Sequence, residues 1–373
     1  MKIIILGSGD VSIELAKYLV NAGHAVTIAD TAYDALAEIG NRIDLRVVIG
    51  NPASPDTLRR AGADNTELLV ATTSDDEANI TACCVAQFLF KIPRKIARLR
   101  SAEYLQEAGV LFGPNSIPID HIIATEYITT QSIMSMIELP GINEIGSFCD
   151  SRIIVASTKV ELGGKLLGKS ISSFSSYDGK ASVLAVYRDK KYLSDLKKEA
   201  FQIGDEVFFC CERDRALSQL SALRKLSIGD RNITIAGGTH IADSLARALS
   251  EKYSVKLVES DPDRAKKTAQ HLHDSEVEVY NADPIDMNFM KEENIDSTDL
   301  YIAATPKDET NIMSSLMLRK VHNVKTLALI KGDSFADLTV NDKSDIDTVV
   351  FPKDSIISAL LSLIRQESVE NVH

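Results

Sequence analysis

The sequence predicts an α/β protein in which two Rossmann-like domains, each with a parallel sheet, are separated by a small α+β module. Within residues 1–30, an apolar strand, a glycine turn, an amphipathic helix and a second strand follow one another, which is one βαβ unit. The same order of elements returns from Asn232 onward. Between the two copies, residues 141–226 carry short alternating strands and turns and a helical stretch, which is typical of a small α+β module.

The first βαβ unit begins at the start of the chain. Lys2–Leu6 is a continuous apolar run, as expected of a strand buried on both faces of a parallel sheet. The run reaches Gly7 after a single charge, so a buried strand is a better interpretation than a signal peptide. Val11–Leu19 has apolar residues at helical spacing, and the second strand, Ala25–Ala29, ends at Asp30.

This unit is repeated in the second half of the chain. The expected elements there are a strand at Ile233–Ala236, a turn at Gly237-Gly238-Thr239, a helix from about Ile241 and a strand at Val255–Val258. Glu259 ends that second strand, as Asp30 does in the first copy. Ala71–Asn79 also corresponds to Ala303–Asn311, since each follows an apolar strand and opens a helix. Copies about 230 residues apart indicate duplication of a whole domain.

The remaining segments complete the expected domain organisation. The middle module should contain strands at Ile153–Val155, Ser182–Tyr187 and Glu206–Cys210 and a closing helix at Ala216–Leu226. Two further helices are predicted, at Ile122–Leu139, ended by Pro140-Gly141, and at Ser355–Arg365. The chain then divides into a first Rossmann domain (1–123), a crossover helix (124–140), the small module (141–226), a second Rossmann domain (231–350) and a C-terminal helix and tail (351–373).

Composition excludes several classes of function. The formal net charge of −12 argues against nucleic acid as the main ligand, because phosphate contacts need a basic patch. No run approaches the length of a transmembrane helix, so any membrane role should come through a partner. The five cysteines include no Cys-x-x-Cys pair, and we expect small buried side chains in a reducing cytosol rather than a metal site.

The first glycine loop predicts a nucleotide site. Gly7 permits the tight turn, Gly9 lets the backbone approach a pyrophosphate, and Ser12 is small enough to replace the usual third glycine. The helix that follows offers free N–H groups to phosphate. Asp30 would accept hydrogen bonds from a ribose diol and repel a 2′-phosphate, which favours NAD(H) over NADP(H). The ribose of ATP or ADP would satisfy Asp30 equally well, and a scaffold that has lost its ligand is the alternative.

Further candidate residues stand at the ends of later strands. If Lys95–Arg100 is a strand, Arg98 and Arg100 share one face, and a guanidinium there can clamp phosphate. Solvated edge arginines are the alternative. Thr73 and Ser74 also end a strand, where open α/β sheets bind ligands, although they could simply cap the next helix.

The second glycine loop is degenerate. Gly237, Thr239 and Ala242 stand against Gly7, Gly9 and Ser12, and we expect the branched Thr239 to resist a positive φ at the pyrophosphate position. Glu259 keeps the acid, but Ile330 stands where we expect the counterpart of Arg98. The second site should therefore be weaker or empty.

Motifs spread over nearly the whole chain resemble the TrkA family of RCK (KTN) potassium-uptake regulators. They are Met1–Gly9, Asp76–Asn79, Ala97–Leu105, Ile119–Ile123, Gly204–Phe209 and Glu309–Ser314, in the family's order. The resemblance implies RCK N-terminal domains at both Rossmann positions and an RCK C-terminal module at 141–226. It implies a first ligand site made of Gly7, Ser8, Gly9, Asp10, Val11, Asp30, Thr73, Ser74 and Arg98. A second site would lie near Gly238–Thr268 and include Gly238 and Glu259.

The resemblance also implies the function. We expect a cytoplasmic NAD(H)- or ATP/ADP-sensing regulatory subunit, peripheral on the inner membrane, that gates a Trk-type potassium-translocating membrane subunit. We expect it to be a homo-oligomer, a dimer or tetramer. The helix at Ile122–Leu139 has a broad apolar surface that should pack against another domain or subunit, with packing wholly within one chain as the alternative. Its apolar residues are Ile122, Ile123, Tyr127, Ile128, Ile133, Met134 and Ile137. The family's second small module has no counterpart before His373, so we expect a form shortened at its C-terminus.

Two other classes of function compete with this one. An NAD-dependent dehydrogenase needs a catalytic His or Lys in a substrate domain. Residues 141–226 contain no histidine, and we expect Lys159, Lys165 and Lys169 to lie in strands and turns without a partnered acid. We therefore expect no enzyme. The other alternative is a ligand-free RCK scaffold, which nucleotide-binding measurements would distinguish.

Overall fold

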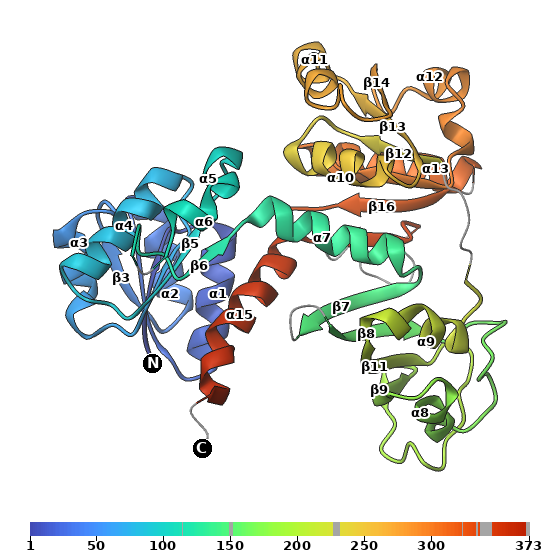
Figure 1. Ribbon diagram of the computed structural model, residues 1–373, viewed down its shortest axis with the longest axis horizontal. Coiled ribbons are helices and arrows are strands. Elements are labelled where there is room, and N and C mark those ends of the chain that lie inside the picture. Colours follow the sequence, from blue (N-terminus) through green and yellow to red (C-terminus); the bar gives the residue numbers. More distant parts are fainter. Residues whose placement is uncertain are drawn as a thin grey trace. The chain divides into compact units, whose positions relative to one another are not determined.

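The computed structural model describes residues 1–113, 115–148, 152–226, 232–322, 324–332, 335 and 345–370. Within those residues the chain forms three sheets, two of six strands and one of five (Figure 1). The chain divides into two compact units. One comprises Met1–Thr129 with the chain from Phe351 onward, and the other comprises Thr130–Val350.

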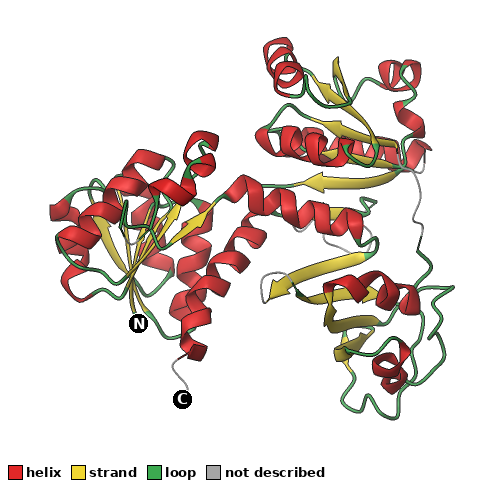
Figure 2. Ribbon diagram, viewed as in Figure 1, coloured by secondary structure: helices red, strands yellow, loops and turns green. Residues whose placement is uncertain are grey.

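The first sheet is a doubly wound parallel sheet in the order β3-β2-β1-β4-β5-β6. Ile3 and Ile5 pack into the core on one face of β1, and Ile4 and Leu6 pack into the core on the other. Helices therefore cover both faces, as Figure 2 shows, which is why this strand is apolar from Ile3 to Leu6. The strands are β1 (Lys2–Leu6), β2 (Ala25–Asp30), β3 (Arg46–Ile49), β4 (Leu68–Ala71), β5 (Arg94–Arg98) and β6 (His121–Ile123). The helices are α1 (Asp10–Asn21), α2 (Tyr33–Arg42), α3 (Pro55–Ala61), η1 (Ala63–Asn65), α4 (Asp76–Phe88), α5 (Ala102–Gln106) and α6 (Ala108–Leu111).

The second Rossmann domain repeats this topology in the order β14-β13-β12-β15-β16-β17. Its strands are β12 (Asn232–Ala236), β13 (Ser254–Glu259), β14 (Val277–Asn281), β15 (Leu300–Ala303), β16 (Lys325–Leu329) and β17 (Thr348–Val350). Its helices are α10 (His240–Ser250), α11 (Pro262–His271), α12 (Met287–Glu292), η4 (Ile295–Ser297) and α13 (Asp308–His322). The predicted α/β fold with two parallel Rossmann-like sheets is confirmed.

Strand register fixes which residues of the two domains are equivalent. Ala71 pairs with Ala97 in the first sheet, and Ala303 pairs with Ala328 in the second. The residue that corresponds to Arg98 is therefore Leu329 and not Ile330, so the expected alignment was wrong by one position. The second domain still has no guanidinium at this position, because Leu329 is as apolar as Ile330.

The small module is an antiparallel sheet in the order β10-β9-β11-β8-β7. Its elements are β7 (Ile142–Phe148), β8 (Ile153–Lys159), η2 (Ile171–Ser173), α8 (Phe174–Tyr177), β9 (Ala181–Arg188), β10 (Lys191–Tyr192), β11 (Glu206–Glu212), η3 (Arg213–Arg215) and α9 (Ala216–Leu223). Its core contains Phe174 and Phe209, whose ring centroids lie 5.5 Å apart. Arg188 binds the fully buried Asp205 through two hydrogen bonds of 2.7 and 2.8 Å, which neutralises that carboxylate.

Two helices complete the cores of the Rossmann domains. The helix α7 (Thr125–Glu138) contributes Ile133 and Ile137 to the core of the second Rossmann domain. The helix α15 (Pro352–Glu370) contributes Ile356, Leu360 and Ile364 to the core around α1 in the first. In the structure, α7 begins after the predicted start at Ile122. Ile122 and Ile123 lie in β6 instead, because the first sheet needs a sixth strand, so their assignment to the helix was wrong.

Two further features concern exposure and length. Among the described residues, no helix is both long and apolar enough to cross a bilayer. Cys83 and Cys211 are buried and Cys84 and Cys210 are half-buried, whereas Cys149 lies outside the described residues.

Candidate functional site

The first candidate site lies at the carboxyl ends of β1, β2, β4 and β5. Gly7 adopts φ +110°, and a Cβ there would lie 3.0 Å from the carbonyl oxygen of Thr72. Only glycine fits this turn without strain. The buried Ser12 hydroxyl lies 2.9 Å from the Thr72 hydroxyl, so the residue in place of a third glycine fastens α1 to the sheet.

The N-terminus of α1 is free of side-chain caps. Gly9 is its N-cap, has no side chain to accept from the first turn, and has nothing within 4 Å of where a Cβ would stand. The N–H groups of Asp10 and Val11, at the start of the helix, therefore have no side-chain acceptor, and the space beside Gly9 is open. The positive end of the helix dipole lies at the same place. This is the geometry that binds phosphate in Rossmann domains.

Asp30 stands across the loop from this helix. Its Oδ2 accepts a hydrogen bond of 2.6 Å from the backbone N–H of Ser8, and its Oδ1 accepts from the N–H groups of Thr31 and Ala32 at 2.5 and 3.2 Å. Partial burial raises the pKa of Asp30, but these hydrogen bonds outweigh it and hold the pKa below its ordinary value. The carboxylate is therefore ionised, and its hydrogen bonds come from neutral groups.

The ends of β4 and β5 are held together by the buried Asn79, whose structural role was not among the predictions from the sequence. Asn79 accepts from the N–H and the hydroxyl of Thr73 at 3.0 and 2.7 Å, and donates to the carbonyl of Arg98 at 2.9 Å. Asp75 caps α4 by accepting from Ala78. The signal that could have found this role is its recurrence, because Asn311 makes the same bonds to Thr305 and Leu329.

Arg98 is the cation of the site. It ends β5 and is half-buried, and its Nε has no hydrogen-bond partner in the described structure. Burial and the neighbouring Arg100 lower the pKa of Arg98, against the opposing effect of Asp76 and Glu126. Since buried polar groups are normally paired, the Nε of Arg98 is a donor available to an anionic ligand.

Arg100 does not share a strand face with Arg98, because β5 ends at Arg98. That expectation was wrong. The Arg100 guanidinium contacts the carbonyl of the exposed Ser74, while the backbone N–H of Arg100 donates to Asp76 at 2.8 Å. Asp76 also accepts from Ser101, so it fixes the chain after β5.

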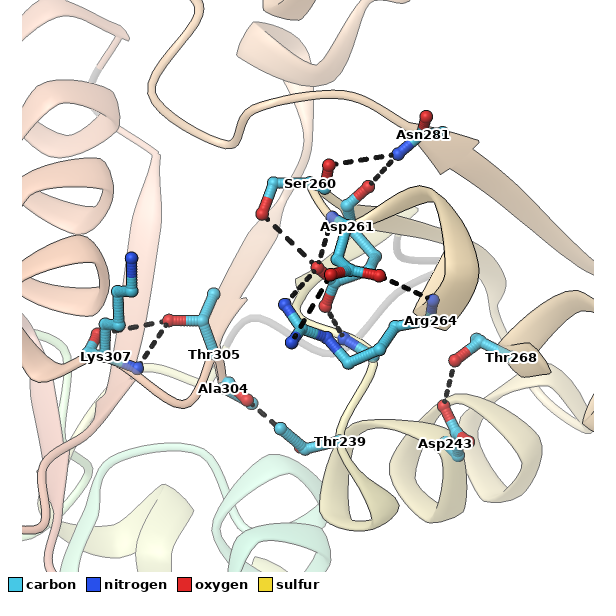
Figure 3. A network of polar contacts seen from close by, with 12 residues as sticks. Thr239, Asp243, Ser260, Asp261, Arg264, Thr268, Asn281, Ala304, Thr305 and Lys307 are labelled. Carbon is cyan, nitrogen blue, oxygen red and sulfur yellow. Dashed lines mark hydrogen bonds and ion pairs between the residues drawn. The ribbon is translucent and has the colours of Figure 1, made fainter. Parts of the chain in front are cut away.

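The second domain has the same loop but a different helix cap, Thr239, whose contact with Ala304 is drawn in Figure 3. Gly237 has φ +115°, and a Cβ there would lie 2.7 Å from the carbonyl oxygen of Ala304, closer still than at Gly7. The Thr239 hydroxyl accepts from the N–H of Ala242 at 3.2 Å and donates to the carbonyl of Ala304 at 3.1 Å. This bond satisfies one N–H group in the first turn of α10, at the position that Ser12 occupies in the first domain.

The physical reason first expected for this difference was wrong. Gly9 and Thr239 have φ −73° and −97°, extended backbone that any residue adopts. No positive φ is required at either position. The hydroxyl of Thr239, rather than strain at its branched Cβ, distinguishes the second loop.

Glu259 takes the place of Asp30 in the second domain and is 2% exposed. It accepts from the N–H groups of Gly238 and Asp261 at 2.5 and 2.7 Å, and it pairs with the guanidinium of Arg264 at 2.8 Å. A Cβ on Gly238 would lie 3.1 Å from Glu259 and 2.9 Å from the Thr268 hydroxyl, so the loop lies tightly against the acid.

The structure thus brings nine of the residues singled out from the sequence to one edge of the first sheet, Gly7, Ser8, Gly9, Asp10, Val11, Asp30, Thr73, Ser74 and Arg98. Gly238 and Glu259 lie at the corresponding edge of the second sheet. In the described part of the chain, no three His, Cys, Asp or Glu side chains form a group that could hold a metal ion.

Comparison with known proteins identifies the family. The model of the TrkA-N domain matches residues 3–123 and 233–352, the two Rossmann domains. The Trk system potassium uptake protein TrkA of Vibrio alginolyticus is 38% identical over all of this chain and 81% of its own length. TrkA of Haemophilus influenzae is 35% identical with the same coverage.

Solved structures agree on the fold. A structure of the GsuK channel superposes on 98% of this chain and 64% of its own with a TM-score of 0.70 at 18% identity. The GsuK channel bound to NAD gives 0.69 at 19% identity, with the same coverage. Fold and loops together define a protein with duplicated TrkA-N domains. The chain belongs to the TrkA family of Trk system potassium uptake proteins.

Proposed function

We propose that this protein is a nucleotide-sensing regulatory subunit of a Trk-type potassium uptake system and that it does not transform its nucleotide. The observation that carries the proposal is the uncapped N-terminus of α1 facing open space, with Asp30 on one side and the unpaired Nε of Arg98 at the same sheet edge. Full-length similarity to proteins named for potassium uptake supports the physiological part.

The ligand that fits this edge is a nucleotide with an adenosine ribose. Its pyrophosphate would lie on the N–H groups of Gly7–Val11, and its ribose diol would donate to Asp30. Thr73 and Ser74 would flank it, and Arg98 would contact a phosphate. We propose NAD(H), because Asp30 disfavours a 2′-phosphate, with ATP or ADP as ligands that share the same ribose. Among solved relatives of the fold, GsuK has been seen with NAD and with ADP.

We propose that the partner is a Trk-type potassium-translocating membrane subunit, gated from the cytoplasmic face of the inner membrane. The chain would act there as a homo-oligomer, a dimer or tetramer. We also propose the domain division 1–123, 124–140, 141–226, 231–350 and 351–373, in which α7 serves as the crossover helix. The small module would then be the RCK C-terminal module.

Calorimetric titration of the full chain with NAD⁺, NADH, ATP and ADP tests the proposal. We expect saturable binding that Asp30→Ala abolishes and that the exposed control Asp64→Ala leaves unchanged. Absence of binding by all four nucleotides would favour a ligand-free scaffold. Steady oxidation of NADH with a 2-oxo acid would instead show a dehydrogenase.

A further inference from the structure

The acids of the two Rossmann domains differ in their charge partners. Glu259 forms an ion pair with Arg264, whereas every hydrogen bond recorded to Asp30 comes from backbone N–H groups or a hydroxyl. The helices α2 and α11 each begin three residues after the acid, at Tyr33 and Pro262. By that equivalence, the residue that corresponds to Arg264 in the first domain is Ala35.

Arg264 donates to the carboxylate of Glu259, the group that would otherwise accept hydrogen bonds from a ribose. A ribose diol binds a Rossmann domain by donating hydrogen bonds to this carboxylate. In the second domain the guanidinium donates to Oε1 of Glu259 at 2.8 Å, alongside the N–H of Asp261, while the N–H of Gly238 binds Oε2. The carboxylate is 2% exposed and already has these partners, so a diol would have to displace a charge-assisted bond to reach it.

The surrounding sequence changes are consistent with this arrangement. Glutamate is one methylene longer than aspartate, and it extends under the loop, where only the glycine at position 238 leaves room. The first domain has Ser8 at that position beside the shorter Asp30. In the first turn of α10, the Thr239 hydroxyl satisfies the N–H of Ala242. The ribose half of a nucleotide would therefore meet a carboxylate that already has its partners, and the first turn of α10 has one free N–H group fewer than that of α1.

We propose that Arg264 is a specificity-determining residue that closes the second Rossmann domain to nucleotides by occupying the ribose acceptor, so that each chain has one nucleotide site. Ala35 is the counterpart that leaves the first site open. This inference rests on the proposed function, since it assumes that the first domain binds a nucleotide.

A matched pair of variants in the first domain tests the inference. Ala35→Arg puts a guanidinium at the position that Arg264 occupies in the second domain. Ala37→Arg adds the same charge to the same helix on an exposed position about 200° round its axis. We expect Ala35→Arg to weaken nucleotide binding roughly ten-fold or more, and Ala37→Arg to leave it within about two-fold. Equal affinities for the two variants would overturn the proposal.

The reverse experiment opens the second domain in a chain whose first site is disabled. Asp30→Ala alone should bind no nucleotide. Adding Thr239→Gly and Arg264→Ala to Asp30→Ala should restore weak nucleotide binding at one site per chain. The control carries Asp30→Ala, Thr239→Gly and Arg247→Ala, and it should bind no nucleotide. Arg247 is a suitable control because it pairs with Asp274 at 2.7 Å in the same domain, away from the loop.

Removal of Arg264 leaves a buried carboxylate unpaired, so each variant is first checked by thermal unfolding. If Arg264→Ala does not fold, Arg264→Gln with Thr239→Gly serves in its place, because an amide keeps a donor without the charge. Two full-strength sites in the wild-type chain, one of them lost on Glu259→Gln, would overturn the inference and leave the proposed function intact. No binding by the wild-type chain would instead defeat the proposed function.

Discussion

Replacement of Arg98 by alanine should separate ligand binding from stability. The Nε of Arg98 has no hydrogen-bond partner in the described structure, so truncation removes no recorded bond at that atom from the ligand-free protein. We expect the free energy of unfolding to change by less than about 1 kcal/mol. A charge-assisted hydrogen bond to phosphate contributes about 1.5–3 kcal/mol, so nucleotide affinity should fall roughly ten- to hundred-fold.

The contrasting arginine is Arg188 in the small module. It makes two hydrogen bonds to Asp205, which is 0% exposed, so Arg188→Ala leaves a buried carboxylate uncompensated. That loss should cost about 3–5 kcal/mol of stability. Chemical denaturation and calorimetry on both variants are the assays. The reasoning is refuted if Arg98→Ala destabilises the protein as much as Arg188→Ala does, or if it binds nucleotide as tightly as the wild type.

Three further predictions concern the first loop and its supports. Gly7→Ala should lower stability by about 1–2 kcal/mol and abolish binding, because φ is +110° and the added Cβ would press on Thr72, as denaturation and titration of the variant would show. Asn79→Ala should lower both stability and nucleotide affinity, whereas Asn311→Ala should lower stability alone; equal losses of affinity would contradict an asymmetric pair of sites. The pKa of Asp30 is depressed below 3.8, so the stability it contributes should be complete above that pH and disappear as pH falls through its folded-state value, measured as the pH dependence of unfolding relative to Asp30→Asn.

The fold could be predicted because its signals are local and repeated. The apolar run of β1, the glycine turn and the acid at the end of β2 recur in β12 and β13, so each copy supports the interpretation of the other. Ile122 and Ile123 were misassigned because a short apolar run fits a strand and a helix equally well. Only pairing with β5 decides between them.

The site was predicted less completely, because its partners depend on three-dimensional register. The alignment of Arg98 with Ile330 needed the pairing of Ala97 and Ala328 to correct it. The role of Arg264 was not predicted, because an arginine in the first turn of a helix usually faces solvent. The sequence difference that indicates this role is five residues after each acid, where Arg264 follows Glu259 and Ala35 follows Asp30.

The central claim is that only the first of the two Rossmann domains binds a nucleotide. The most direct measurement is the stoichiometry of NAD(H) binding to the full chain, with Asp30→Ala and Glu259→Ala titrated in parallel. We predict one site per chain, lost in Asp30→Ala and kept in Glu259→Ala. Binding that survives Asp30→Ala and disappears in Glu259→Ala would contradict the account and assign the nucleotide to the other domain.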